Sequence, residues 1–324
     1  MSGNRQKKTI CGLVALVGPP NTGKSTLLNR LLGQKITIVS PKPQTTRNRV
    51  LGIFNEPDCQ IIFLDTPGLH QARNQLNREM VKTARNAMAE VDVVAYMIDV
   101  TVPTTAGSSG QRAEAARLLQ NVGLPTLLLC NKIDRIEKEK LLPIIAVWQE
   151  VYPFKAIIPI SATRGEGLDI LLKQLRHLLP QGPKLFPEDI PTDASERFIS
   201  SEIIREKIMM FTKDELPYAT AVIIDHFREN PVQNLTTIHA TILVEKDSQK
   251  GIIIGNRGAM LQKIGQAARH TIAAMLGVKV LLKLWVKVQK NWTGNPRTLR
   301  ELGIREGDSR QLSVVSNQKL HPDN

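Results

Sequence analysis

The chain has 324 residues, which is more than one ordinary domain needs and comfortable for two. Its hydrophobic content of 42% suffices for buried cores, and an aromatic content of 4% argues against broad aromatic stacking as the main binding device. The cysteines have no metal-ligand spacing and make no disulfide framework, so we expect small buried side chains in a reducing cytoplasm. They are Cys11, Cys59 and Cys130.

The net charge of +13 is concentrated in two stretches. Residues 1–50 contain nine Lys or Arg and no acid, and residues 246–300 contain eleven against one acid, Asp247. Two concentrated basic patches predict at least one polyanionic partner, although charge alone does not separate RNA, DNA and anionic lipid. No apolar run approaches the roughly 20 residues of a membrane span.

Strand-length apolar runs alternate with helical stretches up to about residue 179. The predicted strands are residues 12–17, 59–64, 92–99, 126–130 and 156–160. The predicted helices are residues 24–33, 75–91, 109–122, 141–152 and 167–179. This alternation predicts an α/β domain with a mostly parallel sheet covered on both faces.

A proline-rich stretch separates this pattern from a different one, because proline suits neither a helix interior nor a central strand. A helix is predicted from a Ser195 cap to residue 212, followed by antiparallel strands at 218–229 and 235–246. A helix at 259–276 and a strand at 278–290 complete an α+β unit. We therefore expect a nucleotide-binding domain at 1–180, a linker at 181–193, a second domain at 194–305 and a disordered tail at 306–324.

The sequence GPPNTGKST at residues 18–26 fits the phosphate-binding pattern G-x-x-x-x-G-K-[ST], with a strand before it and a helix after it. In such a loop the backbone amides surround the phosphates, a lysine reaches the β and γ phosphates, and a serine hydroxyl binds Mg²⁺. The residues expected to bind nucleotide here are Gly18, Asn21, Thr22, Gly23, Lys24, Ser25 and Thr26.

Three further short motifs end predicted strands, where open α/β sheets bind ligands. In DTPG, Asp65 is expected to hold Mg²⁺ through water and the Gly68 amide to face a γ-phosphate. In NKID, Asp134 can accept two hydrogen bonds from guanine, which adenine cannot offer, and Lys132 can cover the base. Asn131 precedes them, and in SAT the Ala162 amide after Ser161 can reach guanine O6.

A second glycine loop, GNRG, lies in the most basic part of the chain. It lacks the Lys-Ser pair of a nucleotide loop and stands between a short and a longer predicted helix, as in KH domains, where G-x-x-G clamps a single-stranded nucleic-acid backbone. Ile252, Ile253, Ile254 and Ile264 are expected to fill the core and partly to line a base-binding floor. The residues expected to bind RNA are Lys250, Gly255, Asn256, Arg257, Gly258 and Lys263.

Together, the set GPPNTGKS, QTTR, DTPG, NKID and SAT resembles the translation-factor-related GTPases, and with the C-terminal half the chain resembles the KH-domain GTPases of ribosome assembly. The likeness covers essentially residues 8–305. It implies a Ras-like G domain followed by a type II KH domain, GTP hydrolysis, and binding to the 3′ end of 16S ribosomal RNA in the small (30S) subunit.

The resemblance also implies that QTTR, from Gln44 to Arg47, is the first switch, in which Thr46 or Thr45 binds Mg²⁺; we favour Thr46. Lys24, Thr46 and Gly68 are then the residues expected to act on the γ-phosphate. Ras-type enzymes place a glutamine after the D-x-x-G glycine, whereas this chain has Leu69, with His70 beside it. Some relatives with an asparagine at the position of Asn21 hold K⁺ there, and this is a further hypothesis.

Two alternatives stay open at this stage. Leu69 favours a non-hydrolysing RNA module with GTP as a structural ligand, and the basic patches allow a GTPase on the membrane surface. The preferred interpretation is a monomeric, cytoplasmic, RNA-binding GTPase, with peripheral contact to the inner membrane surface as an addition.

Overall fold

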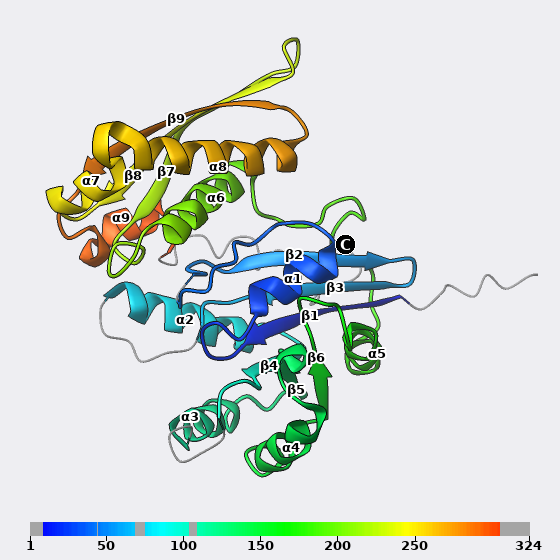
Figure 1. The fold of residues 1–324 in the computed structure, drawn as a ribbon. Coiled ribbons are helices and arrows are strands. Elements are labelled where there is room, and N and C mark those ends of the chain that lie inside the picture. Colours follow the sequence, from blue (N-terminus) through cyan, green and yellow to red (C-terminus); the bar gives the residue numbers. More distant parts are fainter. Residues whose placement is uncertain (1–8, 44, 69–74, 104–108, 305–324) are drawn as a thin grey trace, which may run out of the picture.

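A computed structural model of the chain describes residues 9–43, 45–68, 75–103 and 109–304. These residues form two sheets, each packed against helices (Figure 1). The strands of the larger sheet are β1 (Ile10–Val17), β2 (Val50–Glu56), β3 (Cys59–Asp65), β4 (Val93–Asp99), β5 (Thr126–Asn131) and β6 (Ala156–Ile160). The helices beside it are α1 (Lys24–Leu32), α2 (Gln75–Ala89), α3 (Ser109–Leu119), α4 (Leu141–Gln149) and α5 (Leu168–Leu178).

The six-stranded sheet has the order β2-β3-β1-β4-β5-β6 and is parallel except where β2 pairs with β3. Leu27 and Leu28 of α1 pack with Leu171 and Leu175 of α5 on one face. On the other face, α2, α3 and α4 enclose a core that includes Trp148. Since both faces are covered, the central strands are mostly continuous apolar runs rather than alternating, and every residue of β3 is buried, including Gln60 and Asp65.

All five strands predicted for this sheet are present, and the prediction missed β2. This strand includes a glycine and ends in Asn55 and Glu56, so it lacks the continuous apolar run of its neighbours. Gly52 is nevertheless required, because a Cβ there would lie 2.4 Å from Leu28 Cδ1 and 2.7 Å from Leu32 Cδ1. Helix α1 therefore packs directly on the backbone of β2.

The smaller sheet has the order β7-β8-β9, with β7 and β8 antiparallel and β8 and β9 parallel. Its strands are β7 (Ala221–Asn230), β8 (Leu235–Val244) and β9 (Lys279–Val288). Its helices are α6 (Glu196–Phe211), α7 (Asp247–Ile254), α8 (Ala259–Leu276) and α9 (Pro296–Glu301). The element order matches the prediction, and Ser195 Oγ accepts the predicted capping hydrogen bond from Phe198 N at 3.2 Å. The prediction missed α9 and the preceding turn η5 (Trp292–Gly294).

The connection between the two sheets, residues 182–195, contains no helix or strand. It is fixed to the edge of the larger sheet, where Ile53 N donates to Pro191 O at 2.8 Å and Thr192 Oγ1 donates to Leu51 O at 2.6 Å. Gln60 Oε1 accepts hydrogen bonds from the amides of Leu185 and Phe186. The connection therefore covers the exposed edge of β2 rather than hanging between the domains.

Among the described residues, each helix is too short or too polar to cross a membrane. The predicted tail at 306–324 lies outside the described residues.

Candidate functional site

The first glycine loop connects β1 to α1 and is shaped by two close approaches. Gly18 has φ 142°, and a Cβ there would lie 2.3 Å from Met97 O. Gly23 has φ 102°, and a Cβ there would lie 2.3 Å from Asn131 Nδ2. Between them, Asn21 adopts a left-handed conformation with φ 62°. Glycine is needed at both ends because no side chain fits, and the loop is thereby held over the start of α1.

Helix α1 begins directly at Lys24, and in the described residues no side chain caps its N-terminus. The amides of its first turn are therefore available to an anion, which the helix dipole also favours. The buried Lys24 Nζ donates to Gly18 O at 3.0 Å and to Pro19 O at 2.9 Å. Burial lowers the pKa of Lys24 to about 8, although the negative charge of Asp65 opposes that shift. A phosphate would give this buried ammonium a better partner than two carbonyls.

Three side chains from separate elements meet beside Lys24. Ser25 Oγ lies 2.9 Å from Thr46 Oγ1 and donates to Asp65 Oδ2 at 2.6 Å. Asp65 is fully buried, and burial raises its pKa to about 6 against the hydrogen bond from Ser25. Its other oxygen, Oδ1, is also buried and has no hydrogen-bond partner among the described residues. An oxygen-lined cluster with an unsatisfied carboxylate oxygen fits a hard divalent cation such as Mg²⁺.

The structure also separates the two threonines that the sequence could not distinguish. Thr45 Oγ1 donates to Lys42 O at 2.7 Å, away from the cluster, whereas Thr46 is within hydrogen-bond distance of Ser25. Gly68 follows the same strand as Asp65 and packs on the loop, since a Cβ there would lie 2.8 Å from Pro20 Cα. Gln44, Leu69 and His70 lie outside the described residues.

The predicted base-binding residues meet at the ends of β5 and β6. Buried Asn131 donates to Thr22 O at 2.6 Å and accepts from Ala162 N at 2.9 Å, so it joins the phosphate loop to the SAT motif. Ser161 Oγ donates to Asp134 Oδ1 at 2.7 Å, and this hydrogen bond lowers the pKa of Asp134. Asp134 is therefore kept ionised, as an acceptor for two guanine donors requires.

Lys132 has a left-handed backbone (φ 71°), and its Nζ forms an ion pair with Asp99 Oδ2. This pair holds the lysine stem at the mouth of a pocket of about 500 Å³. The pocket is lined by residues predicted to bind phosphate or metal and by residues predicted to bind the base. Among them are Asn21, Lys24, Thr26, Thr46, Gly68, Lys132 and Ala162. Hence residues predicted for phosphate, for metal and for base binding line one cavity at the carboxyl ends of the parallel strands, although Asp65, Asp134 and Ser161 are not among its lining residues.

The GNRG loop forms a separate site, at the turn η4 (Asn256–Gly258) between α7 and α8. Three of its residues have positive φ: Gly255 at 72°, Arg257 at 49° and Gly258 at 82°. A Cβ on Gly255 would lie 2.7 Å from Met260 Cβ, whereas one on Gly258 would meet nothing within 4 Å. Gly255 is thus needed for the turn, while Gly258 leaves open space at the start of α8, where a phosphate could approach its amides.

Side chains around this loop fall into two groups. Arg257 and Lys263 are exposed, and Lys250 is half-buried. Lys263 Nζ also lies 4.4 Å from the ring centroid of Phe211 on α6. Ile253 and Ile264 are fully buried in the core, whereas Ile252 is 55% exposed. The predicted core role therefore holds for Ile253 and Ile264, whereas the base-binding floor stays a prediction.

The two domains share a buried contact that no sequence pattern predicted. It is made by the α1–β2 segment, residues 35–43 and 45–48, which includes the predicted first switch. Arg47, only 4% exposed, donates to the carbonyls of Pro217, Tyr218 and Thr220. Arg205 of α6, 2% exposed, donates to Thr45 O. No local pattern marks such a contact, because each arginine bonds to backbone atoms far away in the sequence.

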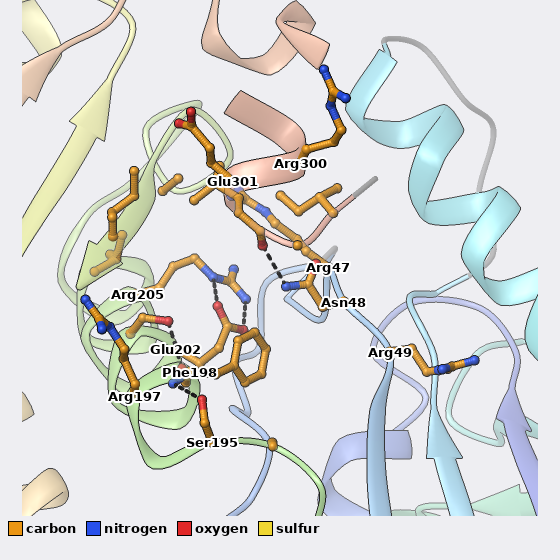
Figure 2. Close-up of a pocket in the computed structure, with 18 of the residues that line it drawn as sticks. Arg47, Asn48, Arg49, Ser195, Arg197, Phe198, Glu202, Arg205, Arg300 and Glu301 are labelled. Carbon is orange, nitrogen blue, oxygen red and sulfur yellow. Dashed lines mark hydrogen bonds and ion pairs between the residues drawn. The ribbon is translucent and has the colours of Figure 1, made fainter. Parts of the chain in front are cut away.

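Figure 2 shows Arg47, Arg205 and Glu202 around a cavity of about 710 Å³ between the domains. Glu202 pairs with Arg205, and nearby Asn48 Nδ2 donates to Leu302 O at 3.1 Å. On the other side of the segment, buried Glu206 forms an ion pair with Lys35 at 2.6 Å. The segment that carries Thr46 is therefore fastened to the three-stranded domain at several points.

Two family profiles match the chain. One, described as a 50S ribosome-binding GTPase, matches residues 13–132, and a KH-domain profile matches residues 215–293. GTPase Era of Geobacter metallireducens is 52% identical over 292 residues, which are 90% of this chain and 97% of that protein. The chain belongs to the GTPase Era family. GTPase Era of Geotalea uraniireducens is 47% identical over 298 residues, covering 92% and 99% of the two chains.

Two solved Era structures have the same fold, each with a TM-score of 0.87 over 92% of this chain and 100% of the other. One is an Aquifex aeolicus Era variant bound to GDP·AlF4−, 40% identical, and the other is Era with MgGDPNP and nucleotides 1506–1542 of 16S ribosomal RNA, 41% identical. The predicted resemblance and the predicted fold, a Ras-like G domain followed by a KH domain, are therefore confirmed. As an Era family member, the chain is a GTPase.

Proposed function

We propose that this chain is a GTP-hydrolysing switch that binds unpaired 16S ribosomal RNA through its KH domain during assembly of the small ribosomal subunit. The observation that carries the proposal is the position of Thr46. Its hydroxyl lies beside Ser25 and Asp65, while the carbonyl of the preceding Thr45 is held by Arg205 of the KH domain. The residue proposed to sense the nucleotide, Thr46, is thus directly adjacent in the chain to Thr45, which contacts the KH domain.

In the nucleotide pocket, we assign the phosphates to the amides of residues 19–24 and to Lys24. Ser25, Thr46 and Asp65 would hold Mg²⁺, which neutralises charge on the β and γ phosphates. Gly68 N–H would contact the γ-phosphate, and Thr26 completes the loop. Guanine would be bound by the Asp134 carboxylate and the Ala162 amide, which are positioned by Ser161 and Asn131. Lys132, paired with Asp99, would cover the base.

At the KH site, Gly255 and Gly258 would admit the RNA backbone, while Lys250, Asn256, Arg257 and Lys263 supply hydrogen bonds and charge. The two sites are separate in the fold, so each can be removed alone. Lys24→Ala should abolish GTP binding and leave RNA affinity in the absence of nucleotide unchanged. Arg257→Glu combined with Gly258→Asp should abolish RNA binding and leave GTP affinity unchanged.

The test uses filter binding of a 16S 3′-end oligonucleotide and of labelled GTP to both variants, with exposed Lys138→Glu as the charge control. Wild-type RNA affinity should also fall steeply with salt, since phosphate contacts release counterions. Single-turnover hydrolysis, with and without the oligonucleotide, completes the test. A flat salt response, or bound GTP that is never hydrolysed, would overturn the proposal, and the latter would favour a module with structural GTP.

Potassium is a finer part of the proposal. Asn21, exposed at the pocket with its Nδ2 bonded to Pro41 O at 2.8 Å, is the residue we assign to a K⁺ beside the phosphates. Hydrolysis should then be faster in potassium than in sodium at equal ionic strength, and Asn21→Ala should remove the difference. Equal wild-type rates in the two salts would exclude K⁺.

We further propose a monomer in the cytoplasm, with a G domain at 1–180, a linker at 181–193 and a KH domain at 194–305. The two basic stretches support peripheral contact with the inner membrane surface. Sedimentation equilibrium tests the monomer. Co-sedimentation with anionic liposomes, against neutral liposomes, tests the membrane contact, and equal recovery from both would exclude it.

A further inference from the structure

Helices α2 and α3, which cover the same face of the six-stranded sheet, leave a cleft between them. We call it the α2–α3 cleft. Its volume is about 1130 Å³, compared with about 500 Å³ for the pocket at the phosphate loop. The cleft is thus large enough for several side chains of another molecule.

Basic side chains line both sides of the cleft. Arg78, Lys82 and Arg85 line it from α2 and are exposed, and their spacing of four and three residues places them on one side of that helix. Arg117 lines it from α3 and is also exposed. The one acid among the described lining residues is Glu114. Within the described part of the chain, Arg78, Arg85 and Arg117 have no hydrogen-bond or ion-pair partner, so their charges are available to a ligand.

The floor of the cleft is apolar. Met88 of α2 and Tyr96 of β4 are 6% and 2% exposed, and Leu118 of α3 is half-buried. In the described part of the chain, the Tyr96 hydroxyl has no hydrogen-bond partner, and burial, together with the charge of Glu114, raises its pKa. The cleft therefore combines a basic rim with an apolar floor that holds one neutral donor.

This combination fits an acidic protein segment better than a polynucleotide. A base stacks on an exposed ring face, whereas Tyr96, the aromatic residue among the described lining residues, is 2% exposed. RNA phosphates would contact the rim and leave the floor uncovered. A second copy of this chain is opposed by the net charge of +13. An amphipathic helix with acids beside an apolar stripe complements both rim and floor.

We propose that the α2–α3 cleft docks an acidic amphipathic segment of a partner protein. Its carboxylates pair with Arg78, Arg85 and Arg117, and its apolar side chains cover the floor. Pro19 of the phosphate loop also lines the cleft, and α2 follows the DTPG motif in the chain. The docked segment therefore lies next to the proposed nucleotide site, on the other domain from the GNRG loop. The inference goes beyond the proposed RNA-binding function and does not depend on it.

Fluorescence anisotropy of labelled peptides on the full chain tests this site. The probe is a peptide of about 16 residues made of glutamate and leucine, with leucine at positions i, i+3, i+4 and i+7. Two comparison peptides replace every leucine by serine or every glutamate by lysine. The probe should bind saturably, and each comparison peptide at least about ten-fold more weakly. Equal affinity of the serine peptide would leave only general charge attraction, and equal affinity of the lysine peptide only apolar adhesion; either result overturns the site.

Two variants locate the contact. Arg85→Glu combined with Arg117→Glu should weaken the probe about ten-fold or more, with exposed Lys138→Glu as the matched charge control. Ala113→Trp, at an exposed position that lines the cleft, should weaken the probe by filling the space while every charge is kept. None of these residues lines the pocket at the phosphate loop, so unchanged GTP affinity serves as the check of folding.

Lack of saturable binding by the probe, or wild-type affinity in both cleft variants, would overturn the site. Oligouridylate RNA is the remaining competitor, and it is added to the Arg257→Glu, Gly258→Asp variant, in which the GNRG loop is disabled. It should not displace the probe there, and displacement would assign the cleft to nucleic acid instead. None of these outcomes affects the proposed RNA site at the GNRG loop, which the filter-binding test decides separately.

Discussion

In the proposed nucleotide site, Asp134 is the residue on which guanine selection would depend most directly. Its carboxylate is kept ionised and oriented by Ser161, so it can accept hydrogen bonds from two donors of one base. Asp134→Asn replaces one acceptor oxygen by an NH₂ donor. This donor would face a guanine N–H, and two donors cannot form a hydrogen bond. We expect GTP affinity to fall on the order of a hundred-fold and xanthosine triphosphate to bind better, as competition binding can measure.

Asp58→Asn, in the exposed turn between β2 and β3, is the matched control and should change neither affinity. Unchanged guanine preference in Asp134→Asn would mean that the base lies elsewhere in the pocket.

Thr45 and Thr46 are adjacent threonines with different surroundings. Thr46 Oγ1 belongs to the cluster with Ser25 and Asp65, whereas Thr45 Oγ1 is bonded to Lys42 O. Thr46→Ala should therefore slow single-turnover hydrolysis in Mg²⁺ by about ten-fold to a hundred-fold, since the variant would lose the proposed metal ligand. Thr45→Ala should change the rate less than about three-fold because its carbonyl contact remains. The reverse order of effects would move the metal site to Thr45.

Among the elements, the α1–β2 segment links the proposed nucleotide site to the KH domain, because it carries Thr46 and contacts α6. Glu206 of α6 binds Lys35 and accepts from Val39 N at 3.3 Å, so it fastens the segment to the KH domain. Burial opposes ionisation of Glu206, but hydrogen bonds and charge from Lys35 and Lys207 outweigh it, and its pKa lies below the ordinary value of 4.5. Ionised Glu206 therefore stabilises the fold above about pH 4.5, and this contribution is lost as pH falls through the lowered pKa.

Glu206→Gln should accordingly lower the free energy of unfolding by about 1–3 kcal/mol at pH 7, because Lys35 and Val39 lose a charged acceptor. Calorimetry from pH 7 to pH 3 should show the melting temperatures of wild type and variant converging at the acid end. A constant difference across this range would mean that the charge of Glu206 does not fasten the segment.

At the scale of elements, the sequence predicts most of the fold because local patterns mark it. Buried parallel strands appear as continuous apolar runs, and the glycine loops stand between a strand or helix and the next helix. The patterns fail for β2, which is a mixed edge strand, and for α9, a six-residue helix without an apolar repeat.

The candidate site likewise contains residues that the sequence predicts and residues that it does not. Lys24, Ser25, Asp65 and Asp134 are found from motifs because each motif requires a residue type at a fixed position. The roles of Arg47 and Arg205 could not be found, since their partners are distant backbone carbonyls. Residues that connect domains are specified by the packed fold and have no local signature.

For the whole molecule, the proposed nucleotide and RNA sites lie on two domains that are joined by buried contacts. Helix α2 follows the DTPG strand, and its Leu76 and Met80 pack with Trp292 and Leu299 of the KH domain. The segment with Thr46 and the helix that follows Gly68 in the chain therefore contact the same domain. Coupling between two sites is reciprocal. If a bound nucleotide changes the affinity for RNA by some factor, bound RNA changes the affinity for that nucleotide by the same factor.

The most direct test of this coupling is the dissociation constant of a 16S 3′-end oligonucleotide, measured with a non-hydrolysable GTP analogue and with GDP bound. The account predicts that the two constants differ by at least about five-fold. It also predicts that Arg205→Ala, confirmed as folded, brings them together by releasing Thr45. Equal constants in the wild type would contradict the claim that the third phosphate is sensed by the RNA-binding domain.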